Sequence, residues 1–430
     1  MVMKKYYYER SNLLESEINI NFEELLWMNE EQTEEWIESL RSFILSEWDD
    51  NGIPPTIGQN TKDIKKNFMK LREYDVHHKF LVRDDSGNEN VIKNYNKHAS
   101  GINQFFPTML KTRVNNGSIY DWFTDEYKDK FQKVILRILK RDSMYNWSKC
   151  VLDGDTYKFL VRDFQLGQKL FPAGIQAFRL GLGQPAVNFP PLTARYLYEH
   201  YTNHIEQDEP LNIYDPSSGW GGRILGAMSS LKRIHYIGTD PNTDNYIHEI
   251  SKTRYEYVAD FFNNEVLETN EFWEEDQNTY HLFQDGSEFI GNNPEFQSYK
   301  GKLDLVFTSP PYFDREQYSE DEEQSFKLYP KYDSWRDDFL KPTLTNAYEN
   351  LREDRYLLWN IADIKIGKDK YHPLEQDSID ILLSLGAEYH GKLKMLMTSM
   401  VGVDQSNVKN AVKINGTYLK YEPIFIFYKK

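Results

Sequence analysis

The chain has 430 residues, a formal net charge of -16 and a single cysteine, Cys150. This length predicts one principal domain with one or two smaller ones, and a lone cysteine excludes an intrachain disulfide framework and a multi-cysteine zinc site. No stretch approaches the roughly 18 apolar residues of a membrane span and the amino terminus lacks an apolar signal core, so we expect a soluble, cytoplasmic protein with no membrane partner.

Two helices are predicted in the first 72 residues. Apolar residues recur at helical spacing within residues 31–48 and predict an amphipathic packing helix. These residues are Trp36, Ile37, Leu40, Phe43, Ile44 and Trp48. Thr61 is expected to cap a second helix that carries Ile64, Phe68 and Leu71 on one face. The opposite face of that helix carries Lys62, Lys65, Lys66, Lys70 and Arg72.

The charge is uneven along the chain. Residues 51–150 contain 18 Lys and Arg against 11 Asp and Glu, a local balance of +7 that leaves -23 for the remainder. Between Asn94 and Trp147 the basic residues are mixed with aromatic ones, which suits a nucleic-acid surface because cations meet phosphates and rings stack on bases. Two alternatives stay open, namely that the lysines only solvate helix faces and that the rings form core. The basic residues are Lys97, His98, Lys111, Arg113, Lys128, Lys130, Lys133, Arg137, Lys140 and Arg141, and the aromatic ones are Phe105, Phe106, Tyr120, Trp122 and Phe123.

From about residue 186, short strand-like runs alternate with helical stretches. This alternation predicts an open, mostly parallel sheet with helices on both faces and ligands beyond the carboxyl ends of the strands. The runs are residues 211–214, 235–239, 303–307, 356–361, 393–397 and 424–428. We therefore expect a mostly helical amino-terminal region, residues 1–185, and an α/β domain, residues 186–430.

An acid and a glycine-rich turn follow the first of these runs, in Asp215-Pro216-Ser217-Ser218-Gly219-Trp220-Gly221-Gly222. Gly219 and Gly221 let the backbone turn sharply and let a ligand approach without meeting a Cβ. The turn is not a dinucleotide fingerprint, because the third glycine of that pattern would fall on Ile224. Asp215 would repel a pyrophosphate but attract a cationic sulfonium and ammonium.

Two further acids follow later strand-like runs. Asp240 ends the run at 235–239 and can accept bonds from both hydroxyls of a ribose. Asp285, after Leu282 and Phe283, could accept a bond from the exocyclic amine of an adenine, although such a residue is more often a cap or a solvated loop acid. Three acids at successive strand ends around a glycine turn are a more specific sign of a ligand site than any one of these acids alone.

The third motif, Thr308-Ser309-Pro310-Pro311-Tyr312, ends the apolar run at 303–307. Its prolines fix φ and lack N–H groups, so the carbonyls around them point outward as acceptors beside aromatic faces. Such acceptors suit a flat ring that bears an amino group, as in a nucleobase flipped out of its stack. The alternative is an ordinary turn in which proline stops a strand.

Together the motifs resemble the amino-methyltransferase family that methylates N4 of cytosine or N6 of adenine in DNA. The likeness covers about residues 186–430 and rests on Asp215-Pro216-x-x-Gly219-x-Gly221-Gly222 and on Ser309-Pro310-Pro311-Tyr312. It implies a class I, Rossmann-like methyltransferase fold with a seven-stranded, mostly parallel sheet. It also implies S-adenosylmethionine as cofactor, no metal, and double-stranded DNA with a flipped base as partner.

The resemblance assigns roles to individual residues. Ser309, Pro310, Pro311 and Tyr312 would be catalytic: Ser309 and the Pro310 carbonyl would accept the amine hydrogens, and Tyr312 would stack on the base with Phe313 nearby. Phe189 lies in Asn188-Phe189-Pro190-Pro191, which resembles the segment that closes over the methionine part of the cofactor. The implied cofactor-binding residues are Asp215, Gly219, Gly221, Asp240, Asp285, Phe189 and Thr308.

The likeness leaves several points open. Serine at the first catalytic position is the usual form in the cytosine N4 members, which favours cytosine over adenine. A separate target-recognition domain does not fit in the roughly 120 residues after the motif, so residues 1–185 are the candidate region for target recognition, helped by an insertion at 258–279.

The acidic segment 314–335 is expected to be a mobile lid or a partner contact. An RNA base methyltransferase and a catalytically silent nucleic-acid-binding subunit stay as alternatives, and the oligomeric state, the target sequence and any paired nuclease are not predicted.

Overall fold

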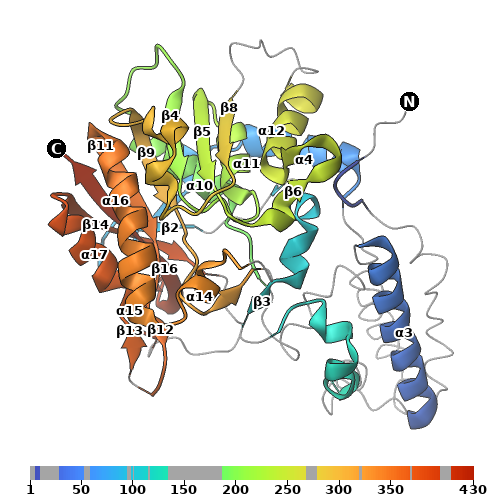
Figure 1. Cartoon of the computed structure of the whole chain (residues 1–430). Helices are drawn as coiled ribbons and strands as arrows, with labels where there is room; N and C mark the ends of the chain where they lie inside the picture. Colours follow the sequence, from blue (N-terminus) through green and yellow to red (C-terminus); the bar gives the residue numbers. More distant parts are fainter. Residues whose placement is uncertain are drawn as a thin grey trace. The chain divides into compact units, whose positions relative to one another are not determined.

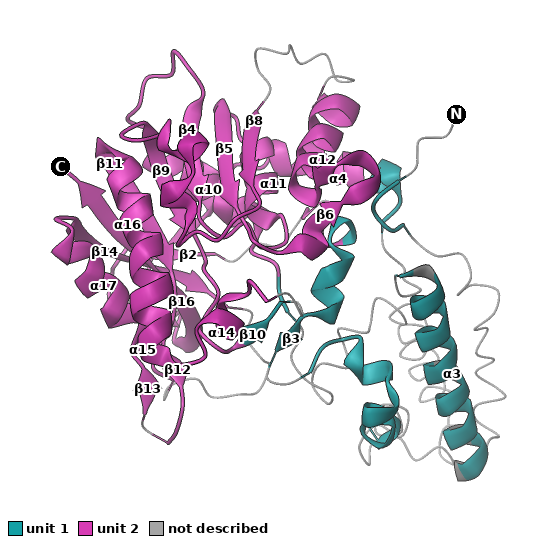
Figure 2. Ribbon diagram, viewed as in Figure 1, with its two compact units in different colours: residues 1–63, 104–187, 316–318 teal, residues 64–103, 188–315, 319–430 magenta. Residues whose placement is uncertain are grey.

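The computed structural model describes residues 5–9, 29–52, 59–93, 98–99, 101–114, 117–133, 186–267, 278–318, 322–368, 370–397 and 408–430. The chain forms two compact units (Figure 2). Unit 1 comprises residues 1–63, 104–187 and 316–318, and unit 2 comprises residues 64–103, 188–315 and 319–430. Part of the amino-terminal region thus belongs to the same compact unit as the α/β fold.

Unit 1 contains the first predicted helix, which the structure confirms as α3, Glu30–Asn51. A capping box fixes its start, because the Asn29 side chain accepts from the Gln32 amide (2.9 Å) and the Gln32 side chain accepts from the Asn29 amide (3.0 Å). The helix ends at Gly52, whose φ of 71° is left-handed. The other described elements of unit 1 are η2 (Pro107–Lys111), β3 (Arg113–Val114), η3 (Asp121–Phe123), η4 (Asp125–Tyr127) and β10 (Glu316–Gln317), and η1 (Ile102–Phe105) spans the boundary between the two units at residues 103 and 104.

The aromatic residues of the basic segment mostly form core. Trp122 and Phe123 pack in one cluster with Ile37, Ile44 and Trp48 of α3. Phe105 and Phe106 are also fully buried. The exposed basic side chains are Lys111, Arg113, Lys128, Lys130 and Lys133, whereas Lys97, Arg137, Lys140 and Arg141 lie outside the described residues. In the described part of this segment, cations therefore face solvent while most rings hold the fold together.

Unit 2 is built on a twisted, mixed sheet (Figure 1). Its strands follow the order β1-β2-β14-β16-β11-β9-β4-β5-β8, with β15 paired to β16. The bounds are β1 Leu81–Val82, β2 Val91–Ile92, β4 Leu211–Asp215, β5 Ile234–Thr239, β8 Thr279–Phe283, β9 Leu303–Thr308, β11 Leu351–Asn360, β14 Glu388–Leu396, β15 Ala411–Ile414 and β16 Thr417–Lys429. All six predicted runs fall on strands of this sheet, and the predicted Rossmann-like α/β architecture is confirmed. Among the described residues the sheet has ten strands rather than the seven that the resemblance implies, because β1, β2 and β15 are added to it.

The strand directions place the site. The neighbours β8, β5, β4, β9 and β11 are parallel, whereas β16 runs antiparallel between β11 and β14. The chain order reverses between β4 and β9, which is the switch point where open α/β sheets bind ligands. The carboxyl ends of β4, β5, β8 and β9 lie at one edge, which is where the predicted site residues are found.

Helices cover both faces of the sheet. Phe307 of β9 packs edge-on against Tyr198 of α10, at a ring distance of 6.0 Å. The adjacent Val306 packs in the opposite core with Leu344 of α16, because successive strand residues point to opposite faces. The helices are α4 Thr61–Arg72, α5 Val76–Lys79, α10 Pro191–Tyr201, α11 Gly222–Met228, α12 Arg254–Phe262, α13 Pro294–Gln297, α14 Ser325–Leu328, α15 Tyr332–Ser334, α16 Lys341–Asn350 and α17 Leu374–Ser384.

Shorter elements complete the unit. Two π-helical turns, η8 (Asn263–Leu267) and η12 (Trp335–Leu340), continue α12 and precede α16. The 3-10 turns are η6 (Thr243–Asn245), η7 (His248–Ile250) and η11 (Ile290–Asn292), and the small ribbons pair β6 (Tyr246–Ile247) with β7 (Lys252–Thr253) and β12 (Ile364–Lys365) with β13 (Tyr371–His372). The segment predicted as a lid contains β10, α14 and α15, and its lid role stays a prediction. Part of the insertion at 258–279 lies in α12 and η8, and residues 268–277 lie outside the described residues.

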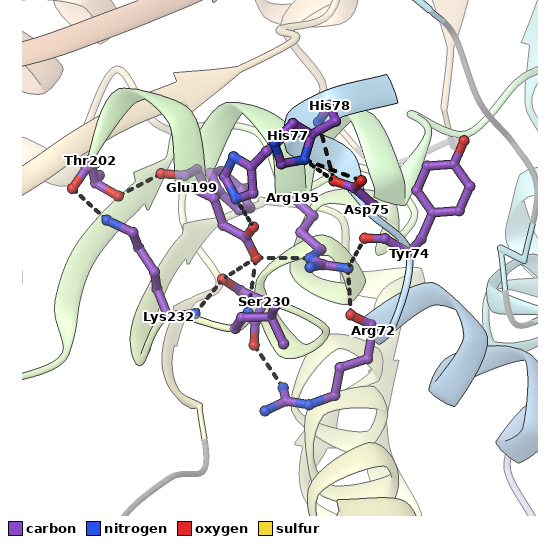
Figure 3. A network of polar contacts seen from close by, with 12 residues as sticks. Arg72, Tyr74, Asp75, His77, His78, Arg195, Glu199, Thr202, Ser230 and Lys232 are labelled. Atoms are coloured by element: carbon purple, nitrogen blue, oxygen red, sulfur yellow. Dashed lines mark hydrogen bonds and ion pairs between the residues drawn. The ribbon is translucent and has the colours of Figure 1, made fainter. Parts of the chain in front are cut away.

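A polar network ties α4 and α5 to the α/β fold (Figure 3). Arg195 of α10 donates through Nη1 to three carbonyls after or at the end of α4, those of Leu71, Arg72 and Tyr74. Its Nε donates to Glu199 at 2.8 Å, and both side chains are almost fully buried. His77 Nε2 lies 2.9 Å from the other oxygen of Glu199. This network explains why residues 64–103 belong to unit 2.

The predicted α4 exists, but its cap differs. The helix begins at Thr61, and the Asn60 side chain rather than Thr61 accepts from the Asp63 amide (2.9 Å). Ile64, Phe68 and Leu71 are buried as predicted. Two of the cations on its other face make contacts within unit 2, since Lys65 pairs with Glu265 at 3.0 Å and Arg72 donates to the Ser230 carbonyl. These two basic residues have a structural role.

Candidate cofactor and catalytic site

The predicted site residues converge at the carboxyl ends of four parallel strands. Asp215 ends β4, Asp240 follows β5, and Thr308 ends β9. Thr308 Oγ1 donates to Asp215 Oδ1 at 2.6 Å, which joins the start of the Thr308-to-Tyr312 motif directly to the glycine turn. The Asp240 amide donates to the Phe283 carbonyl at the end of β8, two residues before Asp285. The topology thus brings together residues that are up to 93 positions apart in the sequence.

Asp215 is fully buried, and both of its carboxylate oxygens already accept hydrogen bonds. Arg223 Nε donates to Oδ2 at 2.7 Å, and the Tyr236 hydroxyl donates to the same oxygen at 2.5 Å. Oδ1 accepts from Thr308 and from the Ser217 amide. This arrangement fits a residue that holds the glycine turn in shape, whereas its predicted direct contact with a cofactor stays a prediction.

The glycine turn has the backbone that the sequence motif requires. Gly219 and Gly221 have φ values of 61° and 77°, in the left-handed region that disfavours side chains with a Cβ. Gly222 lies so close to the Phe189 carbonyl that a Cβ there would clash with the backbone. Substitution of Gly222 would therefore displace one of the two segments.

The segment that resembles a cofactor closure packs on this turn. Asn188 Oδ1 accepts from the Gly222 amide at 3.1 Å, and its Nδ2 donates to the Trp220 carbonyl at 2.6 Å. The Phe189 ring meets Phe307 edge-on at 5.2 Å and lies 5.7 Å from the Arg223 guanidinium. Phe189 is thereby placed between β9 and the glycine turn.

Asp240 faces the same turn. Its Oδ2 accepts from the Gly219 amide at 3.1 Å and its Oδ1 from the Asn242 amide at 3.0 Å. Burial raises the pKa of Asp240 to about 6, although these amides and the Tyr255 hydroxyl oppose the shift. Tyr255 of α12 also donates to the Gly219 carbonyl at 2.5 Å. A carboxylate with a raised pKa beside a glycine backbone fits a ligand that donates hydroxyl hydrogen bonds.

Asp285 follows β8 and is only partly buried. Burial raises its pKa, and a hydrogen bond from the Gly286 backbone partly offsets this shift. Asp285 therefore lies at the predicted strand end, with a side chain that solvent or a ligand can reach.

The motif Ser309-Pro310-Pro311-Tyr312, which is predicted to be catalytic, leaves the sheet at the end of β9. Pro310 is buried, whereas Ser309, Pro311 and Tyr312 are partly exposed. The Tyr312 hydroxyl donates to Glu422 Oε1 of β16 at 2.7 Å and lies 3.5 Å from the Asn360 carbonyl. These contacts connect the motif with the end of β11 and the middle of β16.

Phe313 has an unusual backbone for an aromatic residue. Its φ is 40°, in the left-handed region that costs free energy for residues other than glycine. Its ring is buried and packs edge-on against Tyr332 at 5.6 Å and His372 at 5.2 Å. Burial of this ring fixes the chain direction immediately after Tyr312.

Sequence reasoning missed three residues of this site. Arg223 follows the glycine turn directly, so a basic residue eight positions after Asp215 was a signal for the ion pair. Glu422 is an acid within the otherwise apolar end of the chain, which was also a visible signal. Asn360 Nδ2 donates to the Pro423 carbonyl at 2.9 Å, and its buried Oδ1 has no hydrogen-bond partner among the described residues.

The described residues contain no group of three or more His, Cys, Asp and Glu side chains that could hold a metal ion. Among the described helices, none has the length and apolar character needed to cross a membrane.

Comparisons with solved structures found partial likenesses at low sequence identity. TrmN from Thermus thermophilus is 12% identical, with 56% of this chain and 49% of that chain covered and a TM-score of 0.31. The DNA modification methylase candidate TTHA0409, also from Thermus thermophilus, is 16% identical, with 33% of this chain and 50% of that chain covered and a TM-score of 0.22. A TehB-like methyltransferase from Corynebacterium glutamicum is 13% identical, with 60% and 96% covered and a TM-score of 0.28. The chain thus spans about half the length of the first two.

No curated protein matches the chain in sequence. A family model described as DNA methylase matches residues 303–430, from β9 and the Ser309-Pro310-Pro311-Tyr312 motif to the end of the chain. The match supports the resemblance over these residues, which contain the second of the two sequence motifs, whereas the glycine turn at 215–222 lies outside them. Over residues 303–430 the chain is therefore similar to the DNA methylase family.

Proposed function

We propose that this protein is an S-adenosylmethionine-dependent DNA methyltransferase that acts on an exocyclic amine of a flipped base, N4 of cytosine in preference to N6 of adenine. The observation that supports the proposal most is the 2.6 Å hydrogen bond between Thr308 and Asp215, because Thr308 directly precedes the proposed catalytic residues and Asp215 begins the glycine turn. The family match over residues 303–430 supports the same activity. The preference for cytosine rests on Ser309, the residue type that the cytosine N4 members use.

The residues around the turn fit the proposed cofactor. Asp240 would accept both ribose hydroxyls, and Asp285 would accept from the adenine amine. The bound cofactor would supply an electrophilic methyl group on a sulfonium. Gly219 and Gly221 give the ligand access to the backbone, and Phe189 would close the site from the side of the Asn188 segment.

The catalytic motif would prepare the base for attack. An exocyclic amine is a weak nucleophile because its lone pair is delocalised into the ring. Ser309 and the Pro310 carbonyl would accept its two hydrogens and favour a tetrahedral nitrogen, while Pro311 keeps the turn rigid and Tyr312 stacks on the ring. Orientation of two bound reactants can contribute roughly 7 to 11 kcal/mol to such a reaction.

Target recognition is proposed for the amino-terminal region, residues 1–185. The described part of its basic segment exposes Lys128, Lys130 and Lys133. Exposed cations bind phosphates with an affinity that falls as salt rises. A measured slope of DNA affinity against salt concentration would report this contribution.

The product identifies the activity. Purified protein is incubated with methyl-labelled S-adenosylmethionine and either DNA or RNA, and the digested nucleosides are separated. We expect N4-methylcytosine from DNA, and Ser309→Ala is expected to lower its rate of formation by about 100-fold, as loss of one preorganised polar group does in other enzymes. Ser309→Ala should bind S-adenosylhomocysteine as tightly as the unchanged protein.

Other outcomes of this experiment point to the alternatives. Label in RNA alone would replace the DNA activity with an RNA one, and N6-methyladenine would correct the base. Binding of DNA without any methylated product would favour a silent nucleic-acid-binding subunit. Full activity of Ser309→Ala would show that the reacting amine lies elsewhere.

The pH dependence of cofactor binding tests Asp240. Because burial raises the pKa of Asp240 to about 6, its protonated form stabilises the fold at low pH, and this contribution is lost as the pH rises through about 6. Ribose hydroxyls donate to the ionised form, so the affinity for S-adenosylhomocysteine should change in the opposite direction. We expect about tenfold weaker binding at about pH 5 than at about pH 7 by calorimetry. Asp240→Asn should abolish this difference in affinity. If this variant showed the same difference between the two pH values as the unchanged protein, the ribose contact would be ruled out.

A further inference from the structure

Tyr312 is anchored from a distant strand. Its hydroxyl donates to Glu422 Oε1 at 2.7 Å, although the two residues are 110 positions apart in the sequence. The same hydroxyl lies 3.5 Å from the Asn360 carbonyl at the end of β11. The Tyr312 ring also packs against the core that contains Trp335 and Phe425. One end of the tyrosine is thus held by packing and the other by a carboxylate.

Glu422 is an unusual residue for its position. It lies on β16 opposite Met395 of β14, and it is followed by Pro423 and the buried Ile424 and Phe425. Burial raises the pKa of Glu422, whereas the Tyr312 hydrogen bond and the nearby Lys420 and Arg315 oppose this shift. Placing a carboxyl group here costs desolvation free energy, which only its hydrogen bond and charges offset.

The strand that carries Glu422 is itself fixed at this point. Asn360 Nδ2 donates to the Pro423 carbonyl at 2.9 Å. Asn360 also pairs with Ile424 in the β11–β16 ladder, and the preceding Trp359 pairs with Thr308 of β9. A continuous set of backbone and side-chain bonds therefore leads from the start of the catalytic motif through β11 to Glu422 and back to Tyr312.

We propose that Glu422 is a positioning residue that orients the Tyr312 ring for stacking on the target base. The proposal rests on the proposed methyltransferase function. The Glu422 carboxylate fixes the hydroxyl end of the Tyr312 side chain, so the plane of the ring is set before the base binds. Tyr312 therefore loses less rotational freedom when the base binds. Hydrogen bonds to a charged group are stronger and shorter than neutral ones, which suits this role.

Four proteins test this role with the same DNA and cofactor: Glu422→Ala, Glu422→Gln, Tyr312→Phe and the double variant Tyr312→Phe/Glu422→Ala. We expect Glu422→Ala to lower kcat by about 10- to 100-fold, the effect of losing one charged hydrogen bond, with an unchanged Kd for S-adenosylhomocysteine. Glu422→Gln keeps an acceptor oxygen and should recover most of the rate. In the Tyr312→Phe background, Glu422→Ala should change kcat by less than about twofold, because its partner is already gone.

Glu388→Ala on β14 is the matched control, since this acid pairs with Lys430 and lies outside the site. Its kcat should equal that of the unchanged protein. Additive losses in the double variant, or a loss of cofactor affinity equal to the loss of rate, would assign Glu422 a purely structural role. A higher rate in Glu422→Ala would show that the carboxylate holds Tyr312 back in a resting position. These comparisons require that the protein without substitutions methylates DNA. If that protein is inactive, the result refutes the proposed methyltransferase function rather than the role of Glu422.

Discussion

Asp215→Ala is expected to lower the free energy of unfolding by about 3–5 kcal/mol, because it leaves the buried Arg223 guanidinium without its partner. The same change removes acceptors of Thr308, Tyr236 and the Ser217 amide, so the glycine turn and the end of β9 lose their common anchor. Binding of S-adenosylhomocysteine should fall below detection. Thermal or denaturant unfolding measures the first effect, and calorimetry measures the second.

A double variant separates two explanations for the lost binding. Asp215→Leu/Arg223→Met replaces the buried pair by apolar groups, which is often nearly neutral for stability. If Asp215 acts by shaping the turn, the double variant should bind the cofactor more tightly than Asp215→Ala does, because its turn is again stable. If Asp215 contacts the cofactor directly, the double variant should be stable and still fail to bind. Undiminished binding by Asp215→Ala would remove this residue from the site altogether.

Arg195→Ala is expected to be equally destabilising, by about 3–5 kcal/mol, because it leaves Glu199 charged and buried without its main partner. It also removes the donor that satisfies the carbonyls of Leu71, Arg72 and Tyr74. Amide hydrogen exchange should show early loss of protection in α4, before the central strands open. Denaturant unfolding followed by fluorescence gives the total loss.

An exposed ion pair provides the control for Arg195. Arg83 pairs with Glu89, and both side chains are more than half exposed. Arg83→Ala should therefore change the free energy of unfolding by no more than about 1 kcal/mol. If the two variants lost similar amounts, the buried network would not be what fastens residues 64–103 to the α/β fold.

The sequence predicted the sheet well because its strands are short apolar runs between turn residues. Leu303–Thr308, for example, is buried at every position and was visible as an apolar run. The additional strands β1, β2 and β15 were not predicted, since two to four residues give too little periodicity to recognise. The pairing of β2 with β14 depends on residues about 300 positions apart, which no local pattern encodes.

The candidate site was predicted in outline but not in its connections. The positions of Asp215, Asp240 and Thr308 follow from strand ends in a parallel sheet, and the structure brings them together as expected. The pairing of Asp215 with Arg223 was not predicted, because a carboxylate near a glycine turn suggests a ligand as readily as an internal ion pair. Glu422 was missed because its partner, Tyr312, lies far away in the sequence.

The β1–β2 hairpin extends the sheet beyond one end of β14. In the sheet, β2 pairs with Lys394 and Met395 of β14, on the side that β16 does not occupy. Without the hairpin, this end of β14 would expose unpaired backbone donors and acceptors, which are the usual template for edge-to-edge aggregation. The residues before the α/β domain thus complete part of its sheet and also form the candidate region for target recognition, so deleting them to test recognition would disturb the sheet at the same time. Point substitutions of exposed lysines avoid this ambiguity.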